Sequence, residues 1–270
     1  MVGDPVAHSL SPRLFSSLAS HLGLPLEYRA ERVSPKEFPS FLAGVREGSY
    51  AGLSVTLPHK EAALSLSDEA SASARAVGAA NTLLLHGTTL LADNTDAVGL
   101  TRALGQHRVA LAGARVLILG AGGAARAAAA AARGAGAQKV WVANRTVRHA
   151  RQLAEAQGAT AVPLTAQALP PLLPEVDVLV QATSLGLGRP EETALPAGCV
   201  LHARLAVVDM VYQPVETALL RAARAAGARC VDGLWMLVHQ GAEQLRLWTG
   251  VEVAAPLLET LHAELAGEAR

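Results

Sequence analysis

Cysteine, aromatic residues and net charge are all scarce in this chain of 270 residues. It has two cysteines, Cys199 and Cys230, too few for a disulfide scaffold or a metal cluster. Aromatic residues make up 3% of the chain although 51% of it is hydrophobic, so the apolar content is mainly Ala, Leu and Val. This composition excludes fibrous and disordered classes and suits helices packed on sheets. The length is that of one large domain or two ordinary ones.

The chain also lacks an excess of charge, with 23 basic and 23 acidic residues. Without a long run of one sign, it offers no basic surface for nucleic acid or an anionic membrane. Its apolar stretches end well before the roughly 18 residues of a membrane span, and its start does not resemble a leader peptide. Its histidines form no metal-spaced pair. We therefore expect a cytoplasmic protein without a metal, a nucleic-acid partner or a membrane partner.

Lysine is scarce as well. Lys36, Lys60 and Lys139 are the three lysines among the 23 basic residues. Arginine keeps its proton in proteins, whereas a buried or paired lysine can release one. A lysine retained in such an arginine-rich chain is therefore a candidate amine for chemistry.

The hydrophobic pattern changes near residue 97. Before it, strand-like runs alternate with helical patterns: Leu26–Val33, Tyr50–Thr56, Thr82–His86 and Leu90–Asp93 as strands, Pro12–Leu22 and Pro35–Glu47 as helices. After it, the alternation is regular: strands at Arg115–Leu119, Lys139–Ala143, Asp177–Gln181 and Ala206–Met210, helices at 98–107, 123–135, 147–157 and 215–226, then helices at 234–249 and 255–266. Regular alternation with apolar strands predicts a parallel sheet covered by helices on both faces, an α/β fold.

A glycine-rich loop follows the strand that ends at Leu119. Gly120, Gly122 and Ala125 occupy the three positions of a G-x-G-x-x-A pattern, and an alanine-rich helix begins at once. In this context the glycines allow a tight turn and the approach of a pyrophosphate to the helix N-terminus. The loop therefore predicts a dinucleotide site, although a glycine-rich turn that binds nothing is the alternative.

The type of dinucleotide is indicated at the end of the next strand. NAD-binding proteins usually place a carboxylate there for the ribose, but here the chain reads Asn144, Arg145, Thr146, with Arg148 close behind. A guanidinium can bind a 2′-phosphate that a carboxylate would repel. The segment therefore favours NADP. The alternative is that both arginines are only exposed charges at the start of a helix, and this alternative has more weight for Arg148 than for Arg145.

Polar residues gather near the ends of the early strands. Ser9 and Ser11 flank a helix start, where Ser11 before Pro12 would be a good N-cap. Lys60 follows a proline turn after Ser54 and Thr56, and Asn81 and Asp96 follow in two further clusters.

Such a set suits a polyhydroxylated small molecule. Beside a hydride acceptor, alcohol oxidation or ketone reduction needs a group that exchanges the hydroxyl proton, and a lysine held by an aspartate is a suitable one. Asp96 could instead merely cap the helix expected near residue 98.

These motifs, taken in order, resemble those of the shikimate dehydrogenase family over nearly the whole chain. The matching blocks are Gly3–Pro12, Val55–Lys60, Gly78–Thr82, Asp93–Asp96, Gly120–Arg126, Asn144–Thr146, Ala182–Gly186, Asp209–Pro214 and Gly233–Gly250. The resemblance implies reversible, NADPH-dependent reduction of 3-dehydroshikimate to shikimate in aromatic amino-acid biosynthesis. It also implies a Rossmann-type doubly wound NADP-binding domain at 98–232 and an α/β substrate-binding domain at 1–97 plus 233–270, with the active-site cleft between them.

The resemblance also assigns roles to residues. Lys60 and Asp96 would form the catalytic pair, and Ser9 and Ser11 would bind the substrate carboxylate. Further substrate contacts would come from Thr56, Asn81, Tyr212 and Gln240. The implied cofactor-binding set is Gly120, Ala121, Gly122, Gly123, Ala124, Asn144, Arg145, Thr146, Arg148, Thr183, Gly233 and Met236.

Some positions depart from the family pattern. Ser54 and Gln181 each stand where the family usually has Asn, and Phe15-Ser16 stands where His-Asn is usual. Only Met1 and Val2 precede Gly3, where the family has a full first strand, so we expect either a native start upstream or a sheet without most of that strand.

Two other functions stay open at this point. One is a quinate/shikimate dehydrogenase or a paralogue acting on another cyclohexene acid; the other is a non-catalytic NADP-binding regulatory protein. Retention of both Lys60 and Asp96 argues against the second. The substrate partner is a small molecule, and a homodimer is one assembly that stays open.

Overall fold

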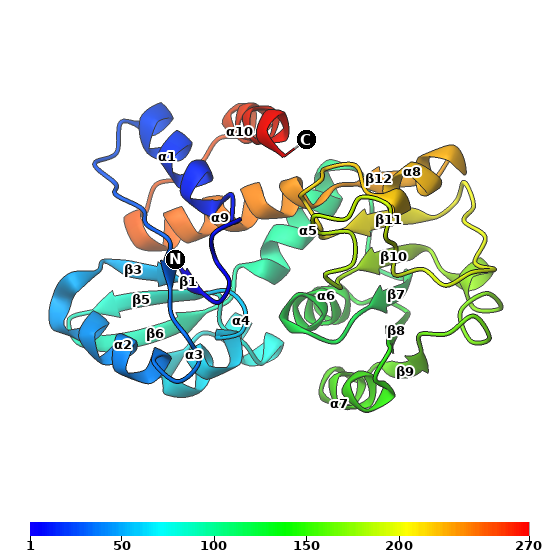
Figure 1. The fold of residues 1–270 in the computed structure, drawn as a ribbon, viewed down its shortest axis with the longest axis horizontal. Coiled ribbons are helices and arrows are strands. Elements are labelled where there is room, and N and C mark those ends of the chain that lie inside the picture. Colours follow the sequence, from blue (N-terminus) through cyan, green and yellow to red (C-terminus); the bar gives the residue numbers. More distant parts are fainter. Residues whose placement is uncertain (270) are drawn as a thin grey trace. The chain divides into compact units, whose positions relative to one another are not determined.

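The computed structural model describes residues 1–269, which divide into two compact units (Figure 1). The first unit consists of Met1–Gly99 and Leu237–Leu265, and the second consists of Leu100–Met236 and the chain from Ala266 onward. Three helices, α5 (Asp96–Gln106), α9 (Gly233–Thr249) and α10 (Ala255–Glu268), contain residues of both units. Within the described residues, no helix combines the length and the apolar character needed to cross a membrane.

A mixed four-stranded sheet forms the centre of the first unit, in the order β3-β5-β6-β4. The strands are β3 (Gly52–Ser54), β5 (Thr82–His86), β6 (Thr89–Asp93) and β4 (Glu69–Ala70). Strand β5 runs antiparallel to both neighbours, and its register places Ser54 and Asp93 opposite Thr82. The polar ends of three strands therefore meet at one end of this sheet.

The other elements of the first unit are mostly short. A two-residue pair, β1 (Val2–Gly3) and β2 (Glu31–Arg32), is parallel, and Val2 also forms a bridge with Val55. The helices are α1 (Ser11–Leu22), α2 (Phe38–Gly44) with a π-helical turn at Val45–Ser49, α3 (Lys60–Leu66), α4 (Ala72–Val77) and, in its larger part, α10 (Ala255–Glu268).

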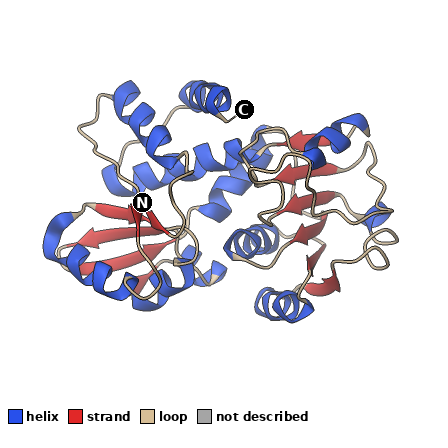
Figure 2. Ribbon diagram, in the orientation of Figure 1, coloured by secondary structure: helices blue, strands red, loops and turns tan. Residues whose placement is uncertain are grey.

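A six-stranded parallel sheet, whose strands are red in Figure 2, forms the centre of the second unit. The strand order is β12-β11-β10-β7-β8-β9, with the labels given in Figure 1. Its strands are β7 (Arg115–Leu119), β8 (Lys139–Asn144), β9 (Thr160–Pro163), β10 (Val178–Gln181), β11 (Ala206–Asp209) and β12 (Arg229–Val231). Its helices include α6 (Gly123–Gly134), α7 (Val147–Gln157) and α8 (Ala218–Ala225), with a 3-10 turn at Leu173–Glu175.

Strands β8 and β9 follow β7 on one side of it in the sheet. Strands β10, β11 and β12, which come later in the chain, lie on the other side of β7. Right-handed crossovers then place helices on opposite faces, which is the doubly wound arrangement predicted from the regular alternation. Side chains of β10 and β11 are buried throughout, as a sheet covered on both faces requires. The point where the strand order reverses lies between β7 and β10.

Several local expectations are wrong. The strand expected at Leu26–Val33 is reduced to β2, and the helix expected from Pro35 begins at Phe38 because the Glu37 carboxylate closes a turn on Ser34. Ser11 is not an N-cap: it is the first helical residue, and its N–H donates to Ser9 Oγ.

The other two differences concern helix starts. The helix expected from residue 215 begins at Ala218, because the Thr217 hydroxyl caps it by accepting from Leu220 N–H. Asp96 opens α5 two residues earlier than expected, and Asn94 Oδ1 accepts its N–H. The side chain of Asn94, rather than that of Asp96, therefore holds this helix start.

Candidate active site

Lys60 and Asp96 form an ion pair in the first unit. Lys60 is the first residue of α3 and Asp96 is the first residue of α5, and Lys60 Nζ donates to Asp96 Oδ2 over 2.6 Å. The side chains are 16% and 6% exposed, respectively. A largely buried ammonium with one carboxylate partner, still open to solvent on one side, can exchange a proton with a bound molecule.

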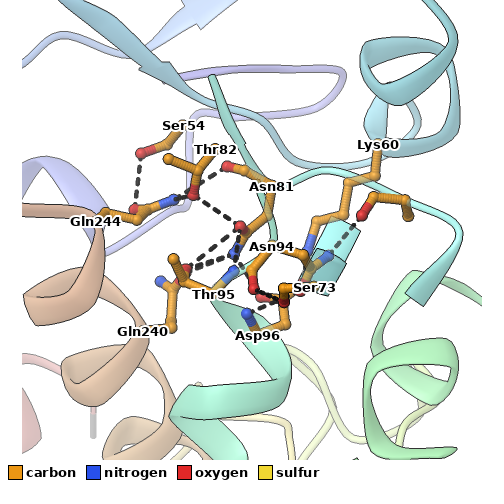
Figure 3. A network of polar contacts seen from close by, with 11 residues as sticks. Ser54, Lys60, Ser73, Asn81, Thr82, Asn94, Thr95, Asp96, Gln240 and Gln244 are labelled. Carbon is orange, nitrogen blue, oxygen red and sulfur yellow. Dashed lines mark hydrogen bonds and ion pairs between the residues drawn. The ribbon is translucent and has the colours of Figure 1, made fainter. Parts of the chain in front are cut away.

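Asn81 holds the other oxygen of Asp96. Its Nδ2 donates to Asp96 Oδ1, to Thr95 Oγ1 and to Gln240 Oε1 over 2.9, 2.9 and 3.0 Å (Figure 3). Its Oδ1 accepts from Thr95 N–H and from the Thr82 hydroxyl, both at 2.8 Å. Because backbone N–H groups only donate, the Asn81 carboxamide has one consistent orientation.

Gln240 reaches this cluster because α9 lies directly against α5. A Cβ added to Gly99 would approach Gln240 Cβ to 2.7 Å, so glycine is required for the close approach. The structure therefore brings together Lys60, Asn81, Asp96 and Gln240, to which the family resemblance assigns catalytic and substrate-binding roles.

A second set of hydrogen bonds supports this cluster from behind. Gln244, one turn beyond Gln240, donates through Nε2 to Asn81 O and to Thr82 Oγ1 over 3.0 and 2.9 Å. Its Oε1 accepts from the Ser54 hydroxyl, which in turn accepts from Tyr28. Burial raises the pKa of Tyr28, and its hydrogen bonds to Ser54 and Ser11 oppose that rise.

Sequence reasoning missed Gln244 and gave Tyr28 no role. The available signal was the spacing of Gln240 and Gln244, which places both amides on one face of α9.

Ser9 and Ser11 lie together at the start of α1. The Ser9 hydroxyl donates to Ser11 Oγ over 3.2 Å, so two hydroxyl groups and a helix N-terminus converge. This arrangement can bind an anionic group such as a carboxylate. Among the described residues, the Thr56 side chain is not hydrogen-bonded to the Asn81 cluster; Thr56 makes main-chain bonds in the turn between β3 and α3.

The glycine loop of the second unit follows β7, beside the reversal point of the sheet. Gly120 has φ +114°, and a Cβ there would lie 2.8 Å from Ala182 O, so the fold itself requires this glycine. Gly122 has an extended backbone, and a Cβ there would meet nothing within 4 Å. The fold therefore does not require glycine at Gly122, whereas a ligand approaching the N-terminus of α6 would.

The turn after β10 borders this loop. Gln181 Oε1 accepts from Thr183 N–H over 2.7 Å, and Gln181 Nε2 donates to Leu185 O over 3.0 Å. Asp209, at the end of β11, accepts from Val211 N–H and from the Thr217 hydroxyl. Burial raises the pKa of Asp209 to about 6, while these hydrogen bonds lower it. Gln181 and Asp209 thus fix the turns that follow two neighbouring strands.

The arginines after β8 are exposed. Asn144 Nδ2 donates to Thr146 O over 3.1 Å and shapes the turn into α7. Within residues 1–269, neither Arg145 nor Arg148 has an ion-pair partner. Two exposed guanidinium groups without a protein carboxylate can accept a phosphate.

The remaining expected positions also lie in the second unit. A Cβ on Gly233 would lie 2.6 Å from Val211 O, so α9 begins in close contact with the turn after β11. Met236 is buried one turn later, and Tyr212 is half-buried. Ala121, Gly123 and Ala124 belong to the glycine loop and the first turn of α6, and are half-buried.

The structure gives the other two lysines ordinary surroundings. Lys36 is exposed, and Lys139 lies 4.6 Å from the ring centroid of Trp141 in a cation–π contact. In the described part of the chain, no group of three or more His, Cys, Asp or Glu side chains is arranged to hold a metal ion.

Comparison with protein families gives three matches along the chain. Residues 1–83 match the shikimate dehydrogenase substrate binding domain, residues 103–190 match shikimate/quinate 5-dehydrogenase, and residues 233–257 match the shikimate 5′-dehydrogenase C-terminal domain.

Individual proteins match over almost the full length. An NADP(+) shikimate dehydrogenase of Halobacterium salinarum is 44% identical over 98% of both chains. A crystal structure of Thermus thermophilus shikimate 5-dehydrogenase with NADP(H) and shikimate is 40% identical, covers 97% of both chains and has a TM-score of 0.86. A 5-ketofructose reductase of a Gluconobacter strain is also similar, with 29% identity, a TM-score of 0.84 and coverage of 98% of this chain and 96% of its own.

Proposed function

The chain belongs to the shikimate dehydrogenase family, and from this premise we propose how its residues divide the reaction. The protein is an NADP-dependent oxidoreductase that reduces 3-dehydroshikimate to shikimate in aromatic amino-acid biosynthesis. The reaction is reversible, and its substrate is a small molecule.

The observation that carries the proposal is the ion pair of Lys60 with Asp96, held by Asn81. NADPH, when bound, supplies a hydride to the carbonyl carbon. The Lys60 ammonium gives a proton to the carbonyl oxygen, which becomes the hydroxyl of shikimate; in the reverse direction Lys60 takes that proton. Asp96 orients Lys60 and compensates its charge.

Ser9 and Ser11 bind the substrate carboxylate in this proposal. Two hydroxyl donors at a helix N-terminus suit an anion. Asn81 and Gln240 contact the ring hydroxyls, and Thr56 and Tyr212 are the further substrate contacts carried over from the family resemblance.

For the cofactor, the proposal assigns the pyrophosphate to the glycine loop at the start of α6. The open space at Gly122 supports this assignment. Arg145 and Arg148 bind the 2′-phosphate, with Asn144 and Thr146 shaping the turn. Thr183, Gly233 and Met236 contact the nicotinamide side.

On this division, residues 1–97 with 233–270 form the substrate-binding domain and 98–232 form the NADP-binding domain. We also propose a cytoplasmic enzyme without a nucleic-acid or membrane partner, in line with its balanced charge. A homodimer remains a further expectation, which size-exclusion chromatography with light scattering would test.

The direct test is an assay of the purified protein with shikimate and NADP⁺, followed by the nicotinamide absorbance. The proposal expects reduction of NADP⁺ that depends on shikimate. Quinate serves as the second substrate, because the central family model also covers quinate dehydrogenases. Turnover of quinate above that of shikimate would favour the quinate alternative, and turnover of neither would favour a non-catalytic NADP-binding protein.

A further inference from the structure

Gln244 is 2% exposed and uses both ends of its carboxamide. Asn81 O is a main-chain carbonyl and can only accept, so the NH₂ end of Gln244 must face it. The Oε1 end then faces Ser54, whose hydroxyl donates to it over 2.9 Å. Ser54 can therefore accept from Tyr28, whose hydroxyl lies 2.6 Å away.

The second NH₂ hydrogen of Gln244 determines the direction of the next bond. Thr82 Oγ1 accepts it over 2.9 Å, so the Thr82 hydrogen is directed to Asn81 Oδ1, 2.8 Å away. With Oδ1 held by Thr82 and by Thr95 N–H, the Asn81 NH₂ group must face Asp96. An inverted Asn81 carboxamide would place an oxygen against the Asp96 carboxylate.

We propose that Gln244 is a positioning residue, which acts through Thr82 to fix the Asn81 carboxamide and, through Asn81, the Lys60–Asp96 pair. The residues follow one another in a continuous chain of hydrogen bonds across β3, β5, α9 and the start of α5 (Figure 3). This inference rests on the proposed roles of Lys60 and Asp96 in proton transfer.

The matched control for Gln244 is Trp248, one turn further along α9. Trp248 Nε1 donates to Leu83 O over 3.1 Å, so it joins the same helix to the same strand. Its ring packs against Phe15 and Tyr28, and it lies outside the proposed site. Trp248→Phe removes a comparable helix-to-strand hydrogen bond and leaves the orientation of Asn81 unchanged.

The experiment measures kcat and KM for shikimate in Gln244→Leu, Gln244→Glu, Thr82→Val and Trp248→Phe. Gln244→Leu and Thr82→Val should each lower kcat by about tenfold, the scale of one lost hydrogen bond, with KM for NADP⁺ unchanged. Gln244→Glu should lower kcat further, because the introduced carboxylate takes the Thr82 hydrogen away from Asn81. Trp248→Phe should retain the wild-type kcat.

The double variant Gln244→Leu/Thr82→Val separates positioning from general loss of stability. If both residues act on Asn81 in series, the double variant should lose no more kcat than either single variant. Gln244→Leu/Trp248→Phe should show independent effects. Additive losses for Gln244 with Thr82, or a kcat loss in Trp248→Phe equal to that in Gln244→Leu, would overturn the inference.

The Lys60→Ala variant distinguishes a failure of the inference on Gln244 from a failure of the proposed function. If Lys60→Ala loses turnover while the Gln244 variants keep the wild-type kcat, the inference on Gln244 is wrong and the proposed function stands. If Lys60→Ala keeps turnover, the proposed role of Lys60 in proton transfer is wrong, and the inference on Gln244, which rests on that role, fails with it. Circular dichroism of each variant checks that it is folded, and Gln244→Met replaces Gln244→Leu if the latter is not.

Discussion

The two units differ in the groups that they offer to a ligand: the first offers polar side chains, and the second offers main-chain groups. The first unit buries many polar side chains, and those of Asn81, Thr82, Thr95 and Asp96 are hydrogen-bonded to one another or to neighbours from distant elements. The second unit has an apolar core and presents main-chain groups at the start of α6. A proton-transfer site needs side chains in fixed orientations, whereas a pyrophosphate can be bound by the peptide N–H groups of the main chain.

The difference extends to which changes each unit tolerates. In the first unit, removing one partner leaves a buried polar group unsatisfied, which costs about 1–3 kcal/mol. In the second unit any side chain at Gly120 would collide with Ala182, although the first unit also has a close-packed glycine, Gly99. The following substitutions test the roles of the two units separately.

The largest effect is expected for Lys60→Ala. General acid–base groups typically contribute about 10²- to 10⁴-fold, so kcat should fall by that factor while KM for shikimate changes much less. Steady-state kinetics measure both constants. Lys36→Ala, which removes an exposed lysine, is the control and should retain full activity. Near-wild-type turnover of Lys60→Ala would assign proton transfer to Asp96 or to water.

The next effect is on the stability of the second unit, which should depend on pH because of Asp209. Burial raises its pKa from 3.8 to about 6, so the folded protein binds an extra proton between these values. The protonated carboxyl therefore contributes to the free energy of unfolding below about pH 4. This contribution, about 3 kcal/mol, is lost as the pH rises to about 6.

Asp209→Asn should remove this contribution. The difference in free energy of unfolding between wild type and variant, measured by urea titration from pH 4 to 7, should shift against the wild type as the pH rises. Asp177→Asn is the control with the opposite sign, because the Arg115 guanidinium lowers the pKa of Asp177. A pH-independent difference for Asp209→Asn would contradict a raised pKa.

Cofactor preference should change with Arg145→Asp. Loss of a charge-assisted hydrogen bond of about 1.5–3 kcal/mol corresponds to about ten- to a hundredfold in NADP efficiency, and the new carboxylate repels the 2′-phosphate. The measurement is the ratio of kcat/KM for NADP and NAD at one ionic strength. Arg151→Asp, an exposed arginine further along α7, should leave the ratio near the wild-type value. An unshifted ratio in Arg145→Asp would show that this turn does not bind the phosphate.

The smallest of these effects is expected for Ser9→Ala. Removing one of two donors to the substrate carboxylate should raise KM for shikimate by about tenfold with a smaller change in kcat, because the carboxylate is bound alike in ground and transition states. Ser20→Ala, at an exposed position of α1, is the control. An unchanged KM in Ser9→Ala would remove Ser9 from the site.

The contrast between the units also explains how much the sequence predicts. The glycine loop and the strands around it follow from local patterns, and β7 has the bounds expected from its apolar run. The chemistry of the early polar residues predicted a lysine held by an aspartate, and the family resemblance implied that Lys60 and Asp96 form the catalytic pair. The spacing of Gln240 and Gln244 shows only that both amides share one face of α9. The bonds of Gln244 to Asn81 and Thr82 join residues more than 160 positions apart, so a local pattern does not reveal these partners. The incorrect N-cap at Ser11 has a local cause instead, because Ser9 Oγ, two residues earlier, accepts the Ser11 N–H.

The central claim is that the first unit supplies the proton-transfer chemistry and the second binds the cofactor. The most direct test is to titrate NADPH into the Lys60→Ala variant and follow the nicotinamide fluorescence. The account predicts the wild-type Kd for NADPH in a protein whose turnover has been lost. Weakening of NADPH binding in proportion to the loss of turnover would contradict it, because Lys60 would then contribute to cofactor binding rather than to proton transfer.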